Sequence, residues 1–261
     1  AVPRLLRDVG FPDSNVVVIT EGGLNDLNGL FPSFCSDPGR EQQPDPGDPR
    51  AARTAVEAFK RQAAQKKTLW QFEDLDILIG TDPDADRCGV VVKVPTAQQH
   101  LYGGQDWVLL PADAMWALLL WYRLHRERER YGRLQDAEKK FVVLSHTTSD
   151  AIVLMARKHG LGVIKTWVGF AALAAAVRDV WEGKPCKTLI EGREDPADLK
   201  CHPFVCEYIG MDNGQRSINV AAMEQSNGFS ILGGPPPDNR SLGVGGHVRD
   251  KDGTLAALLI A

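Results

Sequence analysis

Three aspartates stand at every second position in the stretch 79–90: Asp82, Asp84 and Asp86. An apolar run lies on each side of them, which places them in a connection between two expected strands. In extended backbone, side chains at positions i, i+2 and i+4 point the same way. Three like charges on one side repel one another unless a cation lies between them, and carboxylate oxygens suit a hard divalent ion. The spacing therefore predicts a Mg²⁺ site, with Arg87 beside it as a contact for a phosphate oxygen.

The same loop admits two other interpretations. An aspartate-rich turn between two strands can be a solvated connection that binds no ligand. An EF-hand calcium loop begins with the same spacing, but it requires Gly at its sixth position and Glu at its twelfth. Those positions hold Arg87 and Lys93. The EF-hand is excluded, whereas the solvated loop stays open.

The order of residues in this loop, Asp82-Pro83-Asp84-Ala85-Asp86-Arg87, resembles the metal loop of the α-D-phosphohexomutases, the family of phosphoglucomutase and phosphomannomutase. Three later stretches resemble further motifs of that family, in the order in which the family has them: Val168-Gly169-Phe170, Glu224-Gln225-Ser226-Asn227-Gly228 and Arg249-Asp250-Lys251-Asp252-Gly253. Four motifs in the expected order make a chance match a poor explanation.

The resemblance implies an α/β fold of two consecutive domains, each a mixed sheet flanked by helices, as in the central domains of the family. Residues 1–134 would form the metal-loop domain, the family's second, without its opening strand. Residues 135–261 would form the sugar-binding domain, the family's third. The family's first domain carries a phosphoserine loop with the pattern Thr-Ala-Ser-His-Asn-Pro, a string that does not occur here. The chain is therefore expected to be a central piece that lacks the first and fourth domains.

The resemblance also implies a function. The intact enzyme would interconvert hexose 1-phosphate and hexose 6-phosphate through a phosphoserine and a hexose 1,6-bisphosphate, with Mg²⁺ as cofactor. It would be an intramolecular phosphotransferase of the isomerase class, and the chain by itself is expected to be inactive. The alternative is a non-catalytic fragment or pseudoenzyme that binds Mg²⁺ and sugar phosphate. The sequence does not identify the hexose, although glucose phosphate is preferred.

In this family resemblance the metal and catalytic roles fall on the first and last motifs. Asp82, Asp84 and Asp86 would hold Mg²⁺, whose remaining position takes an oxygen of the phosphoserine. Arg87 would steady the phosphoryl group during transfer. Lys251 is the candidate proton carrier for the attacking hydroxyl, although a lysine at a helix start that contacts phosphate or solvent fits the sequence equally well.

The implied substrate-binding roles fall on the two middle motifs. Glu224 and Ser226 would bind sugar hydroxyls, and Gly169 and Phe170 would shape the pocket. His146 follows another expected strand and is a candidate to face the substrate. Because ligands gather at the carboxyl ends of strands in α/β sheets, all these loops could face one cleft between the two domains.

Composition narrows the function classes. The 261 residues are 43% hydrophobic and 25% charged with net charge −4, values of an ordinary globular protein without a nucleic-acid partner. No apolar run reaches the ~18 residues that would span a membrane. The odd number of cysteines, 5, suits reduced thiols and a cytoplasmic location. Cys201, His202 and Cys206 have irregular spacing for a zinc site, and no second pair follows.

Hydrophobic periodicity and turn residues predict the remaining elements. Helices are expected at residues 2–9, 50–66, 112–130, 150–159, after Phe170 to about 181, and from 251 onward. Strands are expected at residues 15–20, 75–79, 90–94, 141–144, 161–165, 187–190, 204–209 and 217–222. Asn213-Gly214 predicts a hairpin between the last two strands. Ser149 is expected to cap a helix, the charge run 123–133 to be a solvated helix end, and residues 21–49 and 191–202 to be mostly loop.

Overall fold

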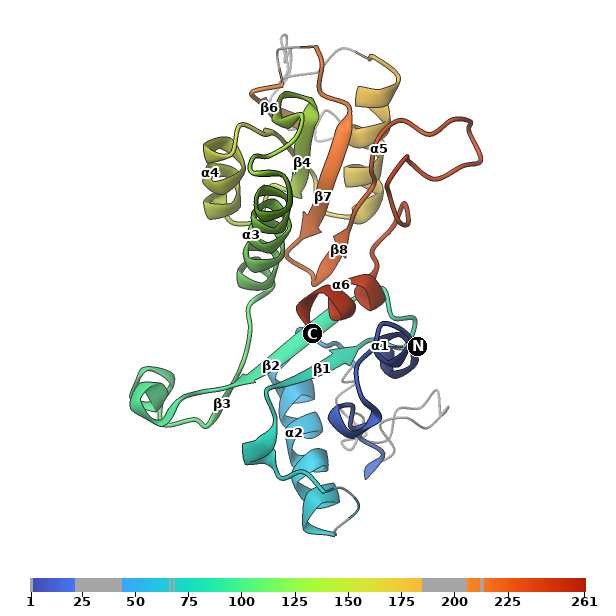
Figure 1. Cartoon of the computed structure of the whole chain (residues 1–261). Helices are drawn as coiled ribbons and strands as arrows, with labels where there is room; N and C mark the ends of the chain where they lie inside the picture. Colours follow the sequence, from blue (N-terminus) through green and yellow to red (C-terminus); the bar gives the residue numbers. More distant parts are fainter. Residues whose placement is uncertain (1, 22–43, 66, 68, 185–205, 212–213) are drawn as a thin grey trace, which may run out of the picture. The chain divides into compact units, whose positions relative to one another are not determined.

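A computed structural model of the chain shows two compact units (Figure 1). It describes residues 2–21, 44–65, 67, 69–184, 206–211 and 214–261. The first unit comprises Ala1–Pro111 together with Gly253–Ala261, and the second comprises Ala112–Asp252. Each unit contains one sheet with helices packed on it, which confirms the predicted α/β fold class.

In the described residues the sheet of the first unit is antiparallel, with strand order β1-β2-β3, and not mixed as the family resemblance implied. Its strands are β1 (Ile77–Thr81), β2 (Cys88–Lys93) and β3 (Trp107–Leu109). In the β1–β2 hairpin Thr81 lies opposite Cys88, so residues 82–87 form the connecting loop. The two apolar runs around the aspartates therefore form adjacent strands, as the sequence predicts. The β2–β3 connection contains the 3₁₀ helix η4 (Thr96–Tyr102).

The helices of the first unit complete its core. In α2 (Pro49–Ala64) the carboxylate of Asp48 accepts a hydrogen bond from the backbone N–H of Arg50, and proline fills the first helical position. Its residues Val56 and Phe59 are buried against the sheet. The unit also contains α1 (Val2–Asp8), the 3₁₀ helices η1 (Asp13–Asn15) and η3 (Phe72–Asp74), and α6 (Gly253–Ile260).

The strand expected at residues 15–20 is not part of either sheet. The side chain of Gln62 replaces a strand neighbour: its oxygen accepts from the backbone N–H of Thr20 at 2.8 Å, and its nitrogen donates to the carbonyl of Val18 at 3.0 Å. Val17 and Ile19 still pack against the core of the unit. The apolar alternation correctly indicates burial, but a buried side-chain amide binds the backbone instead of a β-ladder.

The sheet of the second unit has the order β6-β5-β4-β7-β8. Its strands are β4 (Lys140–Ser145), β5 (Gly162–Thr166), β6 (Cys206–Ile209), β7 (Ile218–Glu224) and β8 (Gly228–Ser230). The three central strands β5, β4 and β7 are parallel, and the two edge strands run antiparallel to their neighbours. Loops that follow the central strands consequently emerge at one edge of the sheet.

Helices cover both faces of this sheet (Figure 1). On one face lies α5 (Phe170–Trp181), whose Leu173 and Val177 form a buried core with Phe141, Val143 and other residues. On the other face lie α3 (Ala112–Tyr131) and α4 (Asp150–Lys158). The helix α4 begins as predicted, since the hydroxyl of Ser149 accepts from the backbone N–H of Ala151 at 3.2 Å.

The hairpin predicted at Asn213-Gly214 is wrong. The strands before and after this turn are β6 and β7, and β5 and β4 lie between them in the sheet. The actual hairpin joins β7 to β8, a strand that the sequence did not predict. The predicted strand 187–190, the predicted loop 191–202 and most of the predicted loop 21–49 lie outside the described residues.

The units also divide the chain at points other than the expected boundary near residue 134. Helix α3 joins the second unit, where the indole N–H of Trp116 donates to the carbonyl of Glu224 at 2.8 Å and the Trp116 ring lies 5.4 Å from that of Phe229. Helix α6 returns to the first unit and packs on α1, β1 and β2. Both assignments depend on which sheet a helix's apolar face meets, and local sequence does not reveal that.

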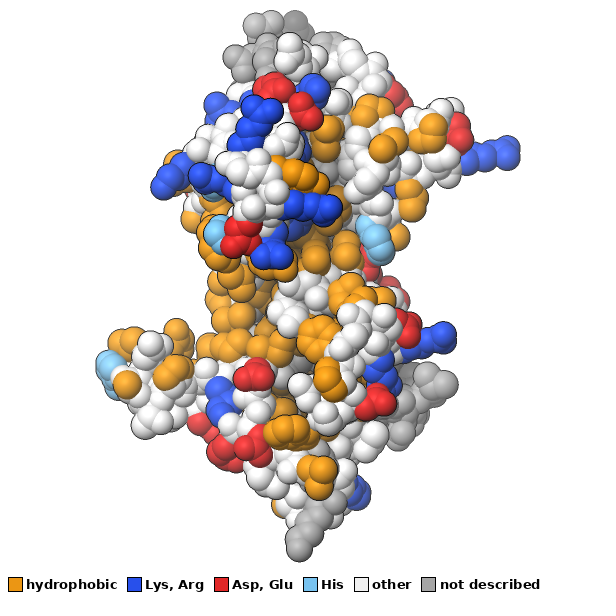
Figure 2. Space-filling view, viewed as in Figure 1, with side chains coloured by type: hydrophobic (Ala, Val, Ile, Leu, Met, Phe, Trp, Pro, Cys, Tyr) orange, Lys and Arg blue, Asp and Glu red, His pale blue; other side chains and the backbone are white. Residues whose placement is uncertain are grey.

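The charge run at the end of α3 is mostly solvated, with Arg123 and Glu127 as partly buried exceptions. Lysine, arginine and acidic side chains are interspersed over this face of the second unit (Figure 2), and Arg126 pairs with Glu129 at the surface. Arg123 instead turns inward and donates to the carbonyl of Val220 in β7. In the described part of the chain, no helix has the length and apolar character needed to cross a membrane.

Candidate functional site

The aspartate loop between β1 and β2 is held in a tight, defined shape. Ala85 adopts the left-handed conformation with φ 58°, and its N–H donates to the carbonyl of Asp82 at 3.0 Å. The N–H of Arg87 donates to the carboxylate of Asp82, also at 3.0 Å. These bonds fold the loop over Asp82, so its side chain is only 12% exposed.

The three aspartates come together as the spacing predicts. Asp82, Asp84 and Asp86 each place one carboxylate oxygen within 4.8 Å of the others. Burial raises the pKa of Asp82 to about 6, and the carboxylates of Asp86 and Asp84 add to the rise, although the Arg87 N–H opposes it. Three carboxylates this close together, with Asp82 largely buried, fit a small divalent cation such as Mg²⁺. Among the described residues, these aspartates are the group of three or more His, Cys, Asp or Glu side chains that lie close enough to hold a metal ion.

Arg87 lies beside the cluster and is surrounded by carboxylates. Its Nε is 3.7 Å from Asp82 and 3.8 Å from Asp86, and its Nη1 is 3.5 Å from Asp45. The side chain is 36% exposed, so the guanidinium remains accessible to an anion while it offsets the charge of the loop.

Asp45 is a neighbour of the site that sequence reasoning missed. It belongs to a proline-rich turn that lies directly on β2: a Cβ added at Gly89 would come within 2.0 Å of the carbonyl oxygen of Pro46. Its carboxylate also accepts from the N–H of Gly47 at 2.9 Å. Residues 21–49 were predicted to be mostly loop, but no local signal indicated which strand this part of the loop would meet.

The N-terminus of α6 lies against the same loop. A Cβ added at Gly253 would come within 2.2 Å of the carbonyl oxygen of Arg87 and 2.9 Å of that of Ala85. The last of the four motifs therefore supplies the glycine that permits this contact, two residues after Lys251.

In the second unit, the predicted substrate residues gather at the carboxyl edge of the parallel strands. Glu224 ends β7 and is buried. Its Oε1 accepts a hydrogen bond of 2.8 Å from the backbone N–H of Gly169, which caps α5 with φ 104°. A glycine is required there because other residues rarely adopt that conformation. Two motifs that are 55 positions apart are thus joined directly.

Lys251 and Phe170 lie against the β7–β8 hairpin. A Cβ added at Gly228 would come within 2.5 Å of Cδ of Lys251 and 3.4 Å of the Phe170 ring. The Nζ of Lys251 is 5.9 Å from the centre of that ring and 3.4 Å from the carboxylate of Asp250. The exposed Ser226 lies in the hairpin loop next to Asn227, which has φ 64°.

His146 follows β4 at the same edge. Its ring is exposed and meets the ring of Trp167 edge-on at 5.2 Å, and its backbone N–H donates to the carbonyl of Thr166. Trp167 stands next to the second motif, and no sequence signal singled it out. The second unit therefore brings together Gly169, Phe170, Glu224 and Lys251, while the first unit brings together the aspartates and Arg87. Of the residues considered for zinc, Cys201 and His202 lie outside the described residues.

Comparison with known proteins finds phosphomutases. The phosphoglucomutase of Staphylococcus epidermidis is 28% identical over 132 residues, which are 51% of this chain and 21% of that protein. The resemblance to phosphohexomutases is confirmed. The phosphopentomutases of Homo sapiens and Mus musculus are 24% and 23% identical over 192 residues, 73% and 74% of this chain.

The matched region is a minor part of these relatives: it spans 30% of the human protein and 29% of the mouse protein. No protein-family model matches the chain. A solved structure from Thermus thermophilus, assigned as a phosphomannomutase, can be superposed on this chain with a TM-score of 0.42 and 17% sequence identity. The superposition covers 82% of this chain and 30% of the Thermus chain. A TM-score of that size carries no argument about function.

Proposed function

We propose that this chain provides the Mg²⁺-binding and sugar-binding parts of a cytoplasmic phosphomutase. The intact enzyme interconverts hexose 1-phosphate and hexose 6-phosphate through a phosphoserine and a hexose 1,6-bisphosphate. The cluster of Asp82, Asp84 and Asp86 beside Arg87 is the observation that carries the proposal. Phosphoryl transfer requires mainly positioning and charge neutralisation from the protein, and this loop offers both.

Each part of the chain has a task in this reaction. The aspartates hold Mg²⁺, which when bound supplies positive charge to the phosphoryl group. Arg87 contacts the phosphoryl oxygens as they move between donor and acceptor. The phosphoserine is contributed by another segment, because its motif does not occur in these 261 residues.

The second unit binds the sugar. One carboxylate oxygen of Glu224 accepts the hydrogen bond from Gly169, and the other is available to a sugar hydroxyl. Ser226 lies two residues further on, in the β7–β8 hairpin loop. Phe170 and Gly169 shape the pocket, and His146 adds a polar group at the same strand edge. Lys251 contacts phosphate oxygens or carries the proton of the attacking hydroxyl.

The first test is metal binding by the 261-residue chain. Calorimetric titration should give weak Mg²⁺ binding, since three carboxylates and water are a poor match for a strongly hydrated ion. Asp84→Ala should abolish the signal, whereas Asp76→Ala, an exposed aspartate just before β1, should leave it unchanged. Equal effects of the two substitutions would remove the basis of the metal site. Sub-micromolar affinity in the unmodified chain would show that a further ligand completes it.

The second test is substrate choice. The relatives are named phosphoglucomutase and phosphopentomutase, so glucose 1-phosphate and ribose 1-phosphate should be compared directly. We expect tighter binding of glucose 1-phosphate. Preference for the pentose would overturn the hexose assignment while leaving the phosphomutase assignment intact.

The third test separates a catalytic part from a binding fragment. A coupled mutase assay of the isolated chain should show no turnover, and turnover should appear only in the complete protein. Turnover of the isolated chain that survives repurification and is lost in Asp84→Ala would show that the nucleophile lies within these residues.

A further inference from the structure

The guanidinium of Arg87 is held from outside the aspartate loop. Its Nη1 donates a hydrogen bond of 3.5 Å to Oδ2 of Asp45, a residue of the proline-rich turn. Its contacts inside the loop are longer: the Nε lies 3.7 Å from Asp82 and 3.8 Å from Asp86. This Nε is buried and has no hydrogen-bond partner among the described residues. Asp45 therefore makes the shortest of the three carboxylate contacts that orient the guanidinium.

The carboxylate of Asp45 is itself fixed by its own turn. Its Oδ1 accepts from the backbone N–H of Gly47 at 2.9 Å, and its carbonyl accepts from the N–H of Asp48 at 3.0 Å. The residues on both sides of Asp45 are prolines, which lock their own φ angles. One carboxylate oxygen therefore belongs to the turn, and the other is presented to Arg87 in a defined place.

Arg87 and a bound cation compete for the same oxygens. A guanidinium binds carboxylates through its N–H groups, and Arg87 follows Asp86 directly in the chain. A movement of about 1 Å toward the loop would convert its long contacts with Asp82 and Asp86 into hydrogen bonds. The guanidinium would then occupy oxygens that the three aspartates offer to Mg²⁺.

Asp45 lies where it opposes this movement. We propose that Asp45 is a positioning residue that holds the Arg87 guanidinium away from the loop carboxylates and so keeps them available to Mg²⁺; this inference rests on the proposed function. Asp45 is not one of the three carboxylates whose oxygens lie within 4.8 Å of one another. It acts through Arg87 and not as a metal ligand.

Two other effects of Asp45 would also make its substitution weaken Mg²⁺ binding. One is the loss of a negative charge near the cation, and the other is damage to the turn. Both act whether or not Arg87 is present. A positioning role acts only through the guanidinium, so it disappears when Arg87 is replaced. A double-mutant cycle between the two residues therefore separates the positioning role from both alternatives.

The first experiment is calorimetric titration of the 261-residue chain with Mg²⁺. Asparagine has one acceptor oxygen, so Asp45→Asn can keep the bond to Gly47 while Arg87 loses its partner. We expect this substitution to weaken Mg²⁺ binding by about tenfold, and by less than about twofold when Arg87→Gln is also present. Equal losses in the two backgrounds, or no loss in either, would overturn the inference and leave the proposed function intact. Absence of Mg²⁺ binding in the unmodified chain would overturn both.

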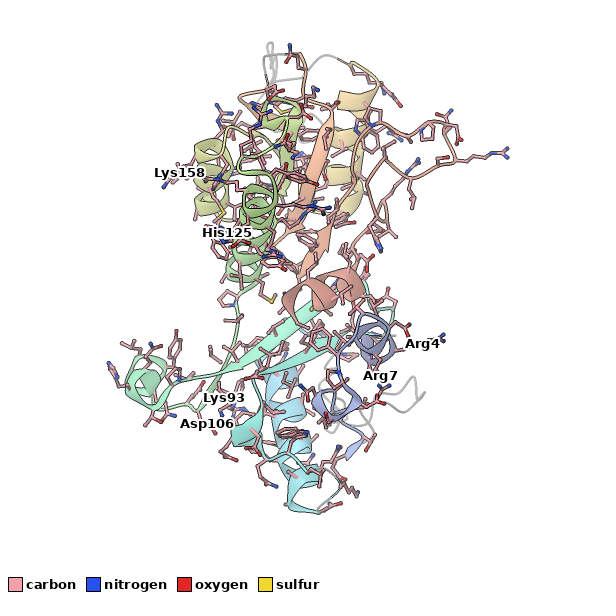
Figure 3. The ribbon with its side chains drawn as sticks, viewed as in Figure 1. Arg4, Arg7, Lys93, Asp106, His125 and Lys158 are labelled. Carbon is pink, nitrogen blue, oxygen red and sulfur yellow. The ribbon has the colours of Figure 1, made fainter. Side chains whose placement is uncertain are left out.

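Asp106→Asn is the matched control. Asp106 pairs with Lys60 at 3.0 Å, and its side chain is 50% exposed, against 40% for Asp45. The aspartate loop joins β2 at Cys88, whereas Asp106 lies near Lys93 at the other end of that strand, roughly 15–20 Å away at the ordinary rise per residue (Figure 3). The control removes the same charge from a surface ion pair of the same unit, so Mg²⁺ affinity should not change.

The second experiment observes the guanidinium directly by nitrogen NMR of the Arg87 Nε–H group. In Asp45→Asn without Mg²⁺ we expect this signal to move in the direction of a hydrogen bond to carboxylate, and saturating MgCl₂ should reverse the movement. In the unmodified chain MgCl₂ should change the signal much less. An Arg87 signal that is the same in both proteins at every MgCl₂ concentration would show that Asp45 does not position the side chain.

The third experiment measures turnover in the complete protein. Asp45→Asn should raise the MgCl₂ concentration needed for half-maximal rate by about tenfold, in line with the expected loss of affinity. Saturating MgCl₂ should restore kcat, because the metal then displaces the guanidinium from the carboxylates. A kcat that stays low at every MgCl₂ concentration would indicate a structural defect and would overturn the positioning role.

Discussion

The α-carbon of Gly253 lies directly on the backbone of Arg87: a Cβ built there would come within 2.2 Å of the Arg87 carbonyl oxygen and 2.5 Å of its carbonyl carbon. These are backbone atoms that cannot rotate away, so a side chain at position 253 must displace the aspartate loop. The contact joins the last motif of the chain to the first within one unit.

Gly253→Ala should therefore weaken Mg²⁺ binding without touching any ligand. We expect a loss on the order of tenfold in affinity, about 1.4 kcal/mol, and a destabilisation of about 1–3 kcal/mol from overpacking. Calorimetric titration and urea unfolding measure the two effects. Gly80→Ala is the matched control, because a Cβ at Gly80 in β1 meets nothing within 4 Å. Unchanged Mg²⁺ affinity in Gly253→Ala would mean that α6 does not shape the loop.

The raised pKa of Asp82 predicts how stability depends on pH. Without an ion, the folded chain keeps this proton up to a pKa of about 6, against an ordinary value of 3.8. Between these values the folded state binds more protons than the unfolded state, so the free energy of unfolding falls as pH rises. Mg²⁺ competes with the proton and should bind more tightly towards the upper end of this window.

Thermal unfolding across this pH window, with and without MgCl₂, measures the effect. The unmodified chain should lose stability as pH rises, and excess MgCl₂ should oppose the loss. Asp82→Asn removes the titrating group, so the free energy of unfolding should fall less as pH rises. An equal slope in Asp82→Asn would assign the pH dependence to other groups.

The clustering of the three aspartates could be predicted from the sequence because its signal is local. The alternation of aspartates between two apolar runs was enough to predict a strand, a ligand loop and a returning strand. Because ligands gather at the carboxyl ends of strands, the loops with Gly169 and Glu224 were predicted to face a common cleft; the structure shows these two residues hydrogen-bonded at one sheet edge. The helix cap at Ser149 could also be predicted, because the capping hydrogen bond joins residues only two positions apart.

Contacts between segments that are distant in the sequence could not be predicted. Asn213-Gly214 is a strong hairpin signal, yet β6 pairs with β5 because the register of a sheet depends on non-local packing. Residues 15–20 have the pattern of a strand, but the side chain of Gln62 binds their backbone. The return of α6 to the first unit depends on a close backbone approach that no periodicity encodes.

The bond from Gly169 to Glu224 changes what a substitution of Glu224 should do. In Glu224→Ala the N–H of Gly169 loses its partner in a partly buried place, which should cost about 1 kcal/mol of stability in addition to the lost sugar contact. In Glu224→Gln the amide oxygen can still accept this bond, so stability should be largely kept while sugar binding weakens. Urea unfolding and titration with glucose 1-phosphate separate the two contributions. Equal stability of the two variants would show that the bond contributes nothing.

Arg123 supports the sheet at a β-bulge and provides the last prediction. The register between β4 and β7 shifts so that Phe141 pairs with Asn219 but Val142 pairs with Ala221, which leaves Val220 without a pairing partner on β4. The guanidinium of Arg123 donates to the carbonyl of Val220 from α3. Burial lowers the pKa of Arg123, and the carboxylate of Glu127 opposes that effect.

Arg123→Met should leave this carbonyl unsatisfied and cost about 1–3 kcal/mol in the free energy of unfolding. The matched control is Arg126→Met on the same helix, where the arginine is exposed and pairs with Glu129 at the surface. That substitution should cost no more than about 1 kcal/mol, as surface ion pairs contribute little. Urea unfolding of both variants gives the comparison. Equal losses would show that the inward arginine acts only as another surface charge, and that the bulge is stable without it.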